Sequence, residues 1–224
     1  MKIKTSHMIL KTNKEVKNEP SKLRGYIGHQ FEQYPVLHNH YGKGKFLYSY
    51  PQVQYHVLNG QASILGISEG ADILKEIAPK INELRLGDSF YNVDEYFIND
   101  KEYDVGVSNN EFHYKFLTPW IGLNSNNFEK YKNLDDWKEK KLMLNKIIIG
   151  NILSMSKGLG IIADRRIYVK SRLKYNPTMY KGVNMLAFIG EFTVNFKIPD
   201  FFGFGKGVSQ GFGTVIKIDE KQKD

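Results

Sequence analysis

The chain contains 224 residues, of which 41% are hydrophobic and 13% aromatic. This is enough apolar material for one large domain or two small ones, and it excludes an intrinsically disordered chain. Cysteine is absent. A disulfide scaffold, a thiol nucleophile and any metal site built on sulfur are therefore excluded, and the composition is typical of a reducing compartment.

Positive charge is in excess, because lysine and arginine outnumber aspartate and glutamate by 32 to 24, a net charge of +8. A polyanion is therefore the first partner to consider, with nucleic acid ahead of a membrane surface. The longest apolar stretch, Ile147–Ile149, is too short to span a bilayer, and the first residues lack the apolar core of a signal peptide. We expect a soluble, cytoplasmic protein with no membrane partner.

The first half of the chain alternates strand-like and helix-like segments. In chain order the patterns predict a strand, a helix that stops before a proline, two strands and a second helix, over residues 3–11, 21–34, 52–58, 61–67 and 71–77. Asn59-Gly60 lies between the two alternating strands and is typical of a two-residue hairpin turn.

The second half follows two polar breaks, Ser108–Glu111 and Asn124–Asn127, which flank a strand-like segment. Its longest helix is predicted from Leu134, with Asp135 or Asn133 as the cap. Spacings of three and four predict the buried face of that helix, made of Trp137, Lys141, Leu144, Ile148, Ile152 and Met155. Alternating residues then predict strands over 166–175, 185–196 and 214–218.

A strand–helix–strand–strand order thus occurs twice. It favours an α+β protein of two tandem ferredoxin-like (RRM-like) domains, the second of which carries a C-terminal glycine-rich loop. The polar breaks place the boundary near the middle of the chain. We therefore predict an N-terminal domain over residues 1–115 and a C-terminal domain over residues 116–224.

The glycine-rich loop is the most unusual segment, with two Gly-Phe-Gly units around a basic centre. Its glycines are Gly203, Gly205, Gly207, Gly211 and Gly213. Glycine lets backbone amides approach a ligand, and consecutive amides form an anion-binding concavity to which Lys206 adds a charge. A phosphate-binding loop needs serine or threonine after its lysine, but Gly207 follows Lys206. A dinucleotide fingerprint needs glycine three residues after Gly205, where Val208 stands. A flexible hairpin remains the alternative, with Phe204 and Phe212 either stacking on bases or anchoring the loop.

Two Gly-aromatic-Gly units separated by five residues that include a lysine resemble the signature of the CRISPR repeat-processing endoribonucleases, which belong to the repeat-associated RNA-binding superfamily. The resemblance implies two ferredoxin-like domains and cleavage of CRISPR precursor RNA within its repeats, without metal. It also implies attack by a ribose 2′-OH, which leaves a 2′,3′-cyclic phosphate and a 5′-OH. It covers a small part of the chain.

A pair of histidines, His38 and His40, precedes two lysines spaced by glycines, Lys43 and Lys45. In extended backbone the two imidazoles point to the same side. One can accept the proton of a 2′-OH while the other protonates the departing 5′-oxygen, since histidine titrates near neutrality. Either lysine can stabilise charge in the transition state. Metal binding by the pair and a solvated polar loop remain alternatives.

The resemblance also bears on which residues act. It implies a catalytic histidine in the first domain near the first helix, and the archaeal branch with a paired histidine is especially similar. In that branch a tyrosine and a lysine assist, for which Tyr48 and Lys45 are the closest matches. We rank His40 first and His38 second, expect no metal and no cofactor, and leave acid and base unassigned. The remaining histidines are interpreted as structural or surface residues, with His29 a minor candidate.

A cationic strand completes the predicted site. Alternate residues of the predicted strand 166–175 share one face, namely Arg166, Tyr168, Lys170, Arg172 and Lys174. Because proteins contact RNA mainly through its backbone and its stacked bases, we interpret this face, with the glycine-rich loop and Lys43, as an RNA track. The run Lys138–Lys141 is interpreted as a solvated helix face.

The preferred prediction is therefore a CRISPR precursor RNA endoribonuclease. The main alternative is a non-catalytic RNA-binding subunit of a CRISPR effector complex, which would need the loop but no histidine pair. A basic protein-interaction module is a third class. The sequence leaves open whether a homodimer forms and which repeat is recognised.

Overall fold

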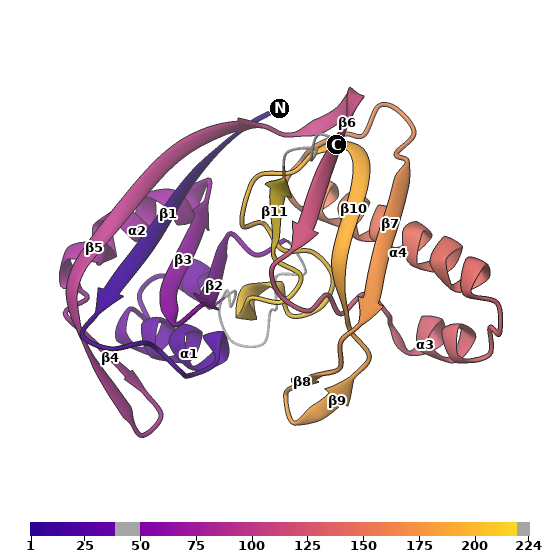
Figure 1. Ribbon diagram of the computed structural model, residues 1–224. Helices are drawn as coiled ribbons and strands as arrows, with labels where there is room; N and C mark the ends of the chain where they lie inside the picture. Colours follow the sequence, from indigo (N-terminus) through magenta and orange to yellow (C-terminus); the bar gives the residue numbers. More distant parts are fainter. Residues whose placement is uncertain (39–49, 219–224) are drawn as a thin grey trace, which may run out of the picture. The chain divides into compact units, whose positions relative to one another are not determined.

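The computed structural model describes residues 1–38 and 50–218, which form two compact units (Figure 1). The N-terminal unit contains residues 2–104 together with Ser209–Gly211, and the C-terminal unit contains the other described residues. The chain thus divides between Asp104 and Val105 rather than at the predicted boundary between residues 115 and 116. The reason is strand β6 (Gly106–Phe116), which pairs with two strands of the C-terminal unit.

The N-terminal unit is a ferredoxin-like sheet with one added edge strand. Its elements in chain order are β1 (Lys2–Thr12), α1 (Pro20–Gln30), β2 (Val53–Leu58), β3 (Gln61–Ile67), α2 (Glu69–Ile77), β4 (Glu83–Leu86) and β5 (Ser89–Asp104), with short 3₁₀ turns η1 (Pro35–Leu37) and η2 (Ala78–Lys80). The antiparallel strand order β2-β3-β1-β5-β4 confirms the ferredoxin-like fold predicted for the N-terminal part of the chain. The predicted hairpin and both predicted helices are also confirmed, although α1 ends four residues early.

The core of this unit lies between the sheet and its helices. Met8 and Leu10 of β1 point to the helix side, because side chains alternate along a strand. Leu23 and Ile27 are one helical turn apart in α1 and are fully buried against them. Helix α2 approaches the sheet closely at Gly66, where an added Cβ would collide with the backbone of Gly70.

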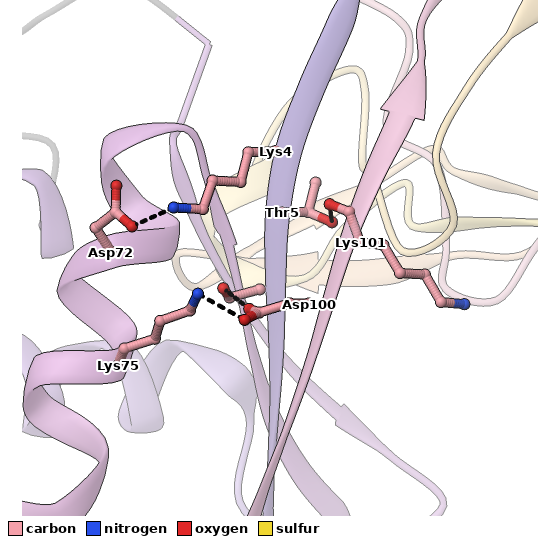
Figure 2. Close-up of polar contacts among 7 residues, drawn as sticks. Lys4, Thr5, Asp72, Lys75, Asp100 and Lys101 are labelled. Carbon is pink, nitrogen blue, oxygen red and sulfur yellow. Dashed lines mark hydrogen bonds and ion pairs between the residues drawn. The ribbon is translucent and has the colours of Figure 1, made fainter.

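Polar side chains tie α2 to the two central strands at one end of the sheet (Figure 2). Lys4 Nζ lies 2.5 Å from Asp72 Oδ1, and Lys75 Nζ lies 2.6 Å from Asp100 Oδ2. The buried Ser6 hydroxyl also donates to Asp100. The hydrogen bond from Lys75 is the main cause that lowers the pKa of the Asp100 carboxyl. Solvent screens exposed pairs of this kind, so they fix the orientation of the helix more than they stabilise the fold.

The main sheet of the C-terminal unit has the same strand order as that of the N-terminal unit, but a loop replaces one of the two connecting helices. Its elements after β6 are α3 (Ser125–Lys132), α4 (Trp137–Gly158), β7 (Val169–Tyr175), β8 (Thr178–Tyr180), β9 (Val183–Met185), β10 (Phe188–Lys197), η3 (Val208–Gln210) and β11 (Val215–Ile218). The main sheet runs β11-β6-β10-β7, which matches β5-β1-β3-β2 in the other unit. The second predicted ferredoxin-like domain is therefore confirmed in its strand order. Where the N-terminal unit has α2, this unit has the glycine-rich loop.

Several local predictions of the second half need correction. Ser108–Glu111 is not a break but the solvated part of β6. Asn124 caps the short helix α3, which the sequence patterns did not predict, and its Oδ1 accepts from the Asn127 amide. Helix α4 is capped by Asp136 and not by Asp135 or Asn133.

Helix α4 buries the later part of its predicted face only. Leu144, Ile148, Ile152 and Met155 are buried, whereas Trp137 is 65% exposed and Lys141 is exposed. The first helical turn of α4 therefore extends beyond the sheet that the rest of it covers. No helix among the residues the structure describes is long and apolar enough to cross a membrane.

Candidate functional site

His38 lies where the chain leaves turn η1, and its backbone is held on both sides. Arg24 of α1 donates through Nη2 to the His38 carbonyl oxygen at 2.6 Å. The buried Tyr55 hydroxyl of β2 donates to the Leu37 carbonyl oxygen at 3.0 Å. The imidazole packs against Gly28, where an added Cβ would lie 2.6 Å from Nδ1. The side chain is therefore fixed against α1.

A shallow hollow of about 570 Å³ opens beside His38. Its lining includes Ser21, Arg24, His29 and Glu32 of the helix α1 region. His29 Nδ1 lies 2.7 Å from Glu32 Oε1, and its side chain is largely exposed. Two imidazoles and one guanidinium thus face one concave surface of the N-terminal unit, a set suited to proton transfer beside a phosphate.

Four predicted site residues, His40, Lys43, Lys45 and Tyr48, lie outside the described residues. The pairing of His38 with His40 therefore stays a prediction. From its place in the first predicted helix, His29 was expected to be only a minor candidate. Helix periodicity places His29 on the same face of α1 as Gly25, but no spacing in the sequence places that face beside His38.

The other histidines do not belong to this hollow. Burial lowers the pKa of His56 to about 3, with the neighbouring His7 adding to the effect. Burial, and then the charge of Lys101, lowers the pKa of His7 to about 4. Both imidazoles are therefore neutral near pH 7. His113 Nδ1 lies 3.1 Å from the Thr193 hydroxyl of β10. These positions agree with the structural role predicted for them.

The glycine-rich loop is anchored in the core of the C-terminal unit. Phe204 is fully buried, and its ring packs edge-on against Phe116, Trp120 and Phe192. Phe212 is half-buried, and its ring lies edge-on to Tyr180 of β8. Of the two expected roles for these phenylalanines, anchoring therefore applies to Phe204.

Four backbone amides of the glycine-rich loop donate hydrogen bonds within the C-terminal unit. The amides of Phe204, Lys206, Phe212 and Gly213 donate to the carbonyls of Gly213, Ile121, Gly207 and Pro119 at 2.9–3.3 Å. These four amides are therefore not available for the predicted anion-binding concavity, and that prediction is wrong for these four positions. Gly205 adopts φ +96°, and an added Cβ there would lie 2.8 Å from the Ile121 carbonyl oxygen. Packing therefore requires glycine at this position.

The tip of the loop, Ser209–Gly211, belongs to the N-terminal unit. There an added Cβ at Gly211 would lie 2.7 Å from the Tyr55 carbonyl oxygen and 3.2 Å from Pro20 Cγ. Tyr55 is also the residue whose hydroxyl holds the backbone before His38. The loop tip and turn η1 therefore contact the same residue of β2, the loop tip at its carbonyl oxygen and η1 at its hydroxyl.

The predicted cationic face is present on β7. Lys170, Arg172 and Lys174 are exposed, while Val169 before them is buried, as is Ser171 between the first two. The Ser171 hydroxyl donates to Asn145 Oδ1 of α4 at 2.6 Å, so the cations lie on the sheet face opposite α4. We call these three residues the cationic stripe.

Arg166 and Tyr168 precede β7 and extend the stripe. The Tyr168 amide donates to Asn195 Oδ1 at 2.7 Å, and Asn195 Nδ2 donates to the Arg166 carbonyl at 3.0 Å. The Asn195 side chain of β10 thereby bonds the backbone of the two residues, in place of the strand hydrogen bonds that begin at β7. The Arg166 guanidinium lies 5.3 Å from the centre of the exposed Tyr168 ring. This arrangement presents a flat aromatic surface and a charge together, as stacking on RNA bases requires.

Acidic neighbours moderate the charge of the stripe. Lys170 pairs with Glu111 of β6 at 3.3 Å, and Arg172 stands opposite Glu191 of β10 in the strand register. Lys115 of β6 stands on the other side of Glu191 and restores a positive balance. Within the described residues no three His, Asp or Glu side chains gather as metal ligands.

Comparisons with known proteins agree over nearly the whole chain. Residues 1–104 match the family described as the Cas6b N-terminal domain, and residues 106–218 match the Cas6b C-terminal domain. A crystal structure of Cas6b is 36% identical with a TM-score of 0.91, covering 97% of this chain and 100% of that one. A crystal structure of the CRISPR RNA processing endoribonuclease Cas6b is 33% identical with a TM-score of 0.74 and the same coverage. An uncharacterized protein of Methanocaldococcus jannaschii is 43% identical over 147 residues, which are 65% of this chain and 99% of that protein.

The buried histidines predict an acid-sensitive fold. The imidazole of His56 has a pKa of about 3 when folded and an ordinary value of 6.5 when exposed. Between pH 6.5 and about 3 the unfolded chain therefore binds a proton at His56 that the folded chain does not bind. The free energy of unfolding is unaffected by this group above pH 6.5 and decreases as the pH falls towards 3. We expect urea unfolding at several pH values to show a shallower loss in His56→Gln than in the unchanged protein. The largest difference in slope is about 1.4 kcal/mol per pH unit.

The control for this measurement is His29→Gln, whose imidazole is largely exposed. Its stability should fall with pH as steeply as that of the unchanged protein. Equal slopes for all three proteins would show that His56 titrates normally in the folded state.

Proposed function

The chain belongs to the Cas6b family, and on that premise we propose that it is a CRISPR RNA-processing endoribonuclease. It cuts precursor RNA within the repeats by attack of a ribose 2′-OH, without metal. The observation that carries the proposal is His38, which Arg24 and Gly28 hold at the edge of a concave surface on the N-terminal unit.

The chemistry needs two proton transfers. One imidazole accepts the 2′-OH proton as the O2′–P bond forms, and a second imidazole donates a proton to the 5′-oxygen as the P–O5′ bond breaks. His38 and His40 take these two roles. The products carry a 2′,3′-cyclic phosphate and a 5′-OH, and no water is consumed.

Charge stabilisation falls to neighbouring residues. Lys45 and Tyr48 stabilise the negative charge that builds on the phosphate oxygens, and Lys43 binds the RNA backbone. Arg24 adds a positive charge at the hollow, and its hydrogen bond to the His38 carbonyl keeps that charge close to the reacting phosphate. A preorganised cation costs no reorganisation when the charge develops.

The C-terminal unit binds the rest of the RNA. The cationic stripe, with Arg166, contacts phosphates along the sheet face opposite α4. Lys206 is an exposed cation of the glycine-rich loop and binds RNA beside it. The loop glycines Gly203, Gly205, Gly207, Gly211 and Gly213 support this contact by shaping the loop rather than by offering a continuous row of amides.

The central experiment incubates the protein with repeat RNA in EDTA, beside a His38→Ala, His40→Ala double variant. We expect the unchanged protein to cut at one position and to leave a 2′,3′-cyclic phosphate, because the 2′-OH is the nucleophile. The double variant should bind RNA but not cut it. Replacing the ribose on the 5′ side of the cut by deoxyribose should abolish cutting.

The outcomes separate the two candidate functions. RNA binding without cutting by the unchanged protein would favour the non-catalytic subunit of a CRISPR effector complex. Cutting that EDTA stops, or that survives the deoxyribose replacement, would contradict the proposed chemistry.

Two glycines of α1 give a matched test of His38. An added Cβ at Gly28 would lie 2.6 Å from the His38 imidazole, whereas at Gly25 it meets nothing within 4 Å. Both changes to alanine raise helix propensity by about 1 kcal/mol, so both variants should fold. We expect Gly28→Ala to slow single-turnover cleavage by up to about 100-fold, because the imidazole must shift.

Gly25→Ala is the control, because it adds the same methyl group to the lining of the hollow without touching His38. This variant should cleave at the rate of the unchanged protein. RNA affinity should change little in both variants, because neither substitution removes a charge. Equal cleavage rates for the two variants would remove His38 from the catalytic residues.

The cationic stripe predicts a change in salt dependence. Changing Lys170, Arg172 and Lys174 together to alanine removes three cations that can each bind a phosphate. For single-stranded RNA the slope of log affinity against log salt should become shallower by roughly 0.7 for each phosphate that is no longer bound. The control removes the same charge from the solvated side of α4, with Lys138, Lys140 and Lys141 changed to alanine. Equal slopes for the two triple variants would exclude a specific phosphate track on β7.

A further inference from the structure

The C-terminal unit contains a second hollow that the proposed chemistry does not use. Its volume is about 1090 Å³, and it is lined by α3, α4, strand β9 with the residue after it, and the glycine-rich loop. The contributing helix residues include Met143, Lys146, Ile147 and Gly150 of α4. Sites for small ligands commonly have about this size, with an apolar lining and a few polar groups.

The lining has an apolar floor. Met143 and Ile147 of α4, Phe128 of α3 and Leu186 after β9 supply half-buried hydrophobic side chains. A flat, uncharged ring could lie against such a surface and displace water from it. Phe128 adds an aromatic face, on which a base can stack.

One amide group at this floor has a fixed orientation. Asn151 Oδ1 accepts a hydrogen bond from the indole Nε1 of the fully buried Trp120 at 3.0 Å. Its Nδ2 group makes no hydrogen bond to any other residue in the described ranges 1–38 and 50–218. The amide therefore keeps two donors for an acceptor on a bound ring.

Two cations stand at the edge of this hollow. Lys206 belongs to the glycine-rich loop, and its amide donates to the Ile121 carbonyl at 2.9 Å, which fixes the backbone there. Its ammonium lies 5.3 Å from the centre of the Tyr180 ring. Lys146 of α4 is exposed and makes no ion pair with another described residue. Glu129 of α3 also lines the hollow, so these three side chains leave a net positive charge of one. An apolar floor with this edge fits a base with its own phosphate.

Gly150 has no side chain, which leaves the hollow open beside α4. It lies within the 22-residue helix α4, where glycine costs about 1 kcal/mol relative to alanine. No neighbouring atom requires it, since an added Cβ would meet nothing within 4 Å. A longer side chain at this position would instead extend into the hollow that Gly150 lines.

We propose that this hollow binds one unpaired nucleotide of the RNA, with its base on the apolar floor and its phosphate at Lys206 and Lys146. The proposal rests on the proposed function, which brings RNA to the glycine-rich loop. The Asn151 amide donates to an acceptor on the base. The hollow therefore selects RNA that has one unstacked base beside the segment bound by the loop.

The test fills the hollow while strengthening the helix. Gly150→Leu occupies the space, and Gly150→Ala gains helix propensity but leaves most of the space open. Both are made in the His38→Ala, His40→Ala background, so that the RNA stays intact. Affinity is measured by fluorescence anisotropy for repeat RNA and for a series of RNAs with a single abasic site at each position.

We expect one abasic position to weaken binding by roughly 10-fold or more in the parent and in Gly150→Ala. In Gly150→Leu, intact RNA should bind more weakly by the same factor, and the abasic site should have no further effect. Thermal unfolding should show that both variants are at least as stable as the parent. Identical abasic profiles for all three proteins would overturn the proposal.

This result is independent of the cleavage assay. Failure of the unchanged protein to cut would contradict the proposed function, whereas the abasic profiles alone decide whether the hollow binds a base. Absence of any RNA binding would overturn both.

Discussion

The hydrogen bonds that Arg24 and Tyr55 donate to the carbonyls of His38 and Leu37 are the constraint on which the proposed catalytic site depends. The Tyr55 hydroxyl is buried, and a buried hydroxyl without an acceptor costs about 1–3 kcal/mol. Turn η1 is therefore pinned to β2 as well as to α1. Because His38 directly follows η1, its backbone position is set by contacts with the core of the N-terminal unit.

The glycine-rich loop follows from a related constraint. It stands where the second helix of a ferredoxin-like fold would be, so its backbone groups have no helix in which to pair. They pair instead with the segment after β6 and with each other, and glycine permits the close approaches that this needs. The loop would therefore bind RNA through Lys206 and through the shape of its surface. The same constraint buries Phe204 and fixes Gly205 beside the second hollow.

Features that depend on a local sequence pattern were predicted correctly. Predictions failed for strands that are exposed to solvent and for contacts between residues far apart in the chain. Alternation was sufficient for the exposed cations of β7, and the Asn59-Gly60 turn for the pairing of β2 with β3. The ferredoxin-like fold followed from the repeated strand–helix–strand–strand order together with the family resemblance. The boundary was misplaced because the solvated part of β6 resembles a loop in composition. The β4–β5 hairpin was missed because most of β5 is exposed and lacks alternation. The shared hollow of His29 and His38 and the amides consumed by the loop are contacts between distant residues, which no spacing reveals.

The two binding surfaces proposed for the C-terminal unit recognise different parts of RNA. The cationic stripe lies on the sheet face opposite α4, whereas the second hollow is lined by α4 itself. RNA that reaches both must pass around the edge of the unit, and a single strand can do so because its backbone bends freely between unstacked bases. Phosphates on the stripe would contribute affinity that salt weakens, whereas a base in the hollow would contribute affinity that salt leaves largely unchanged. Neutralising the stripe should therefore leave the abasic profile intact, and filling the hollow should leave the salt slope of the stripe intact. A pair of variants that failed this separation would indicate one continuous surface, with the hollow binding phosphate rather than a base.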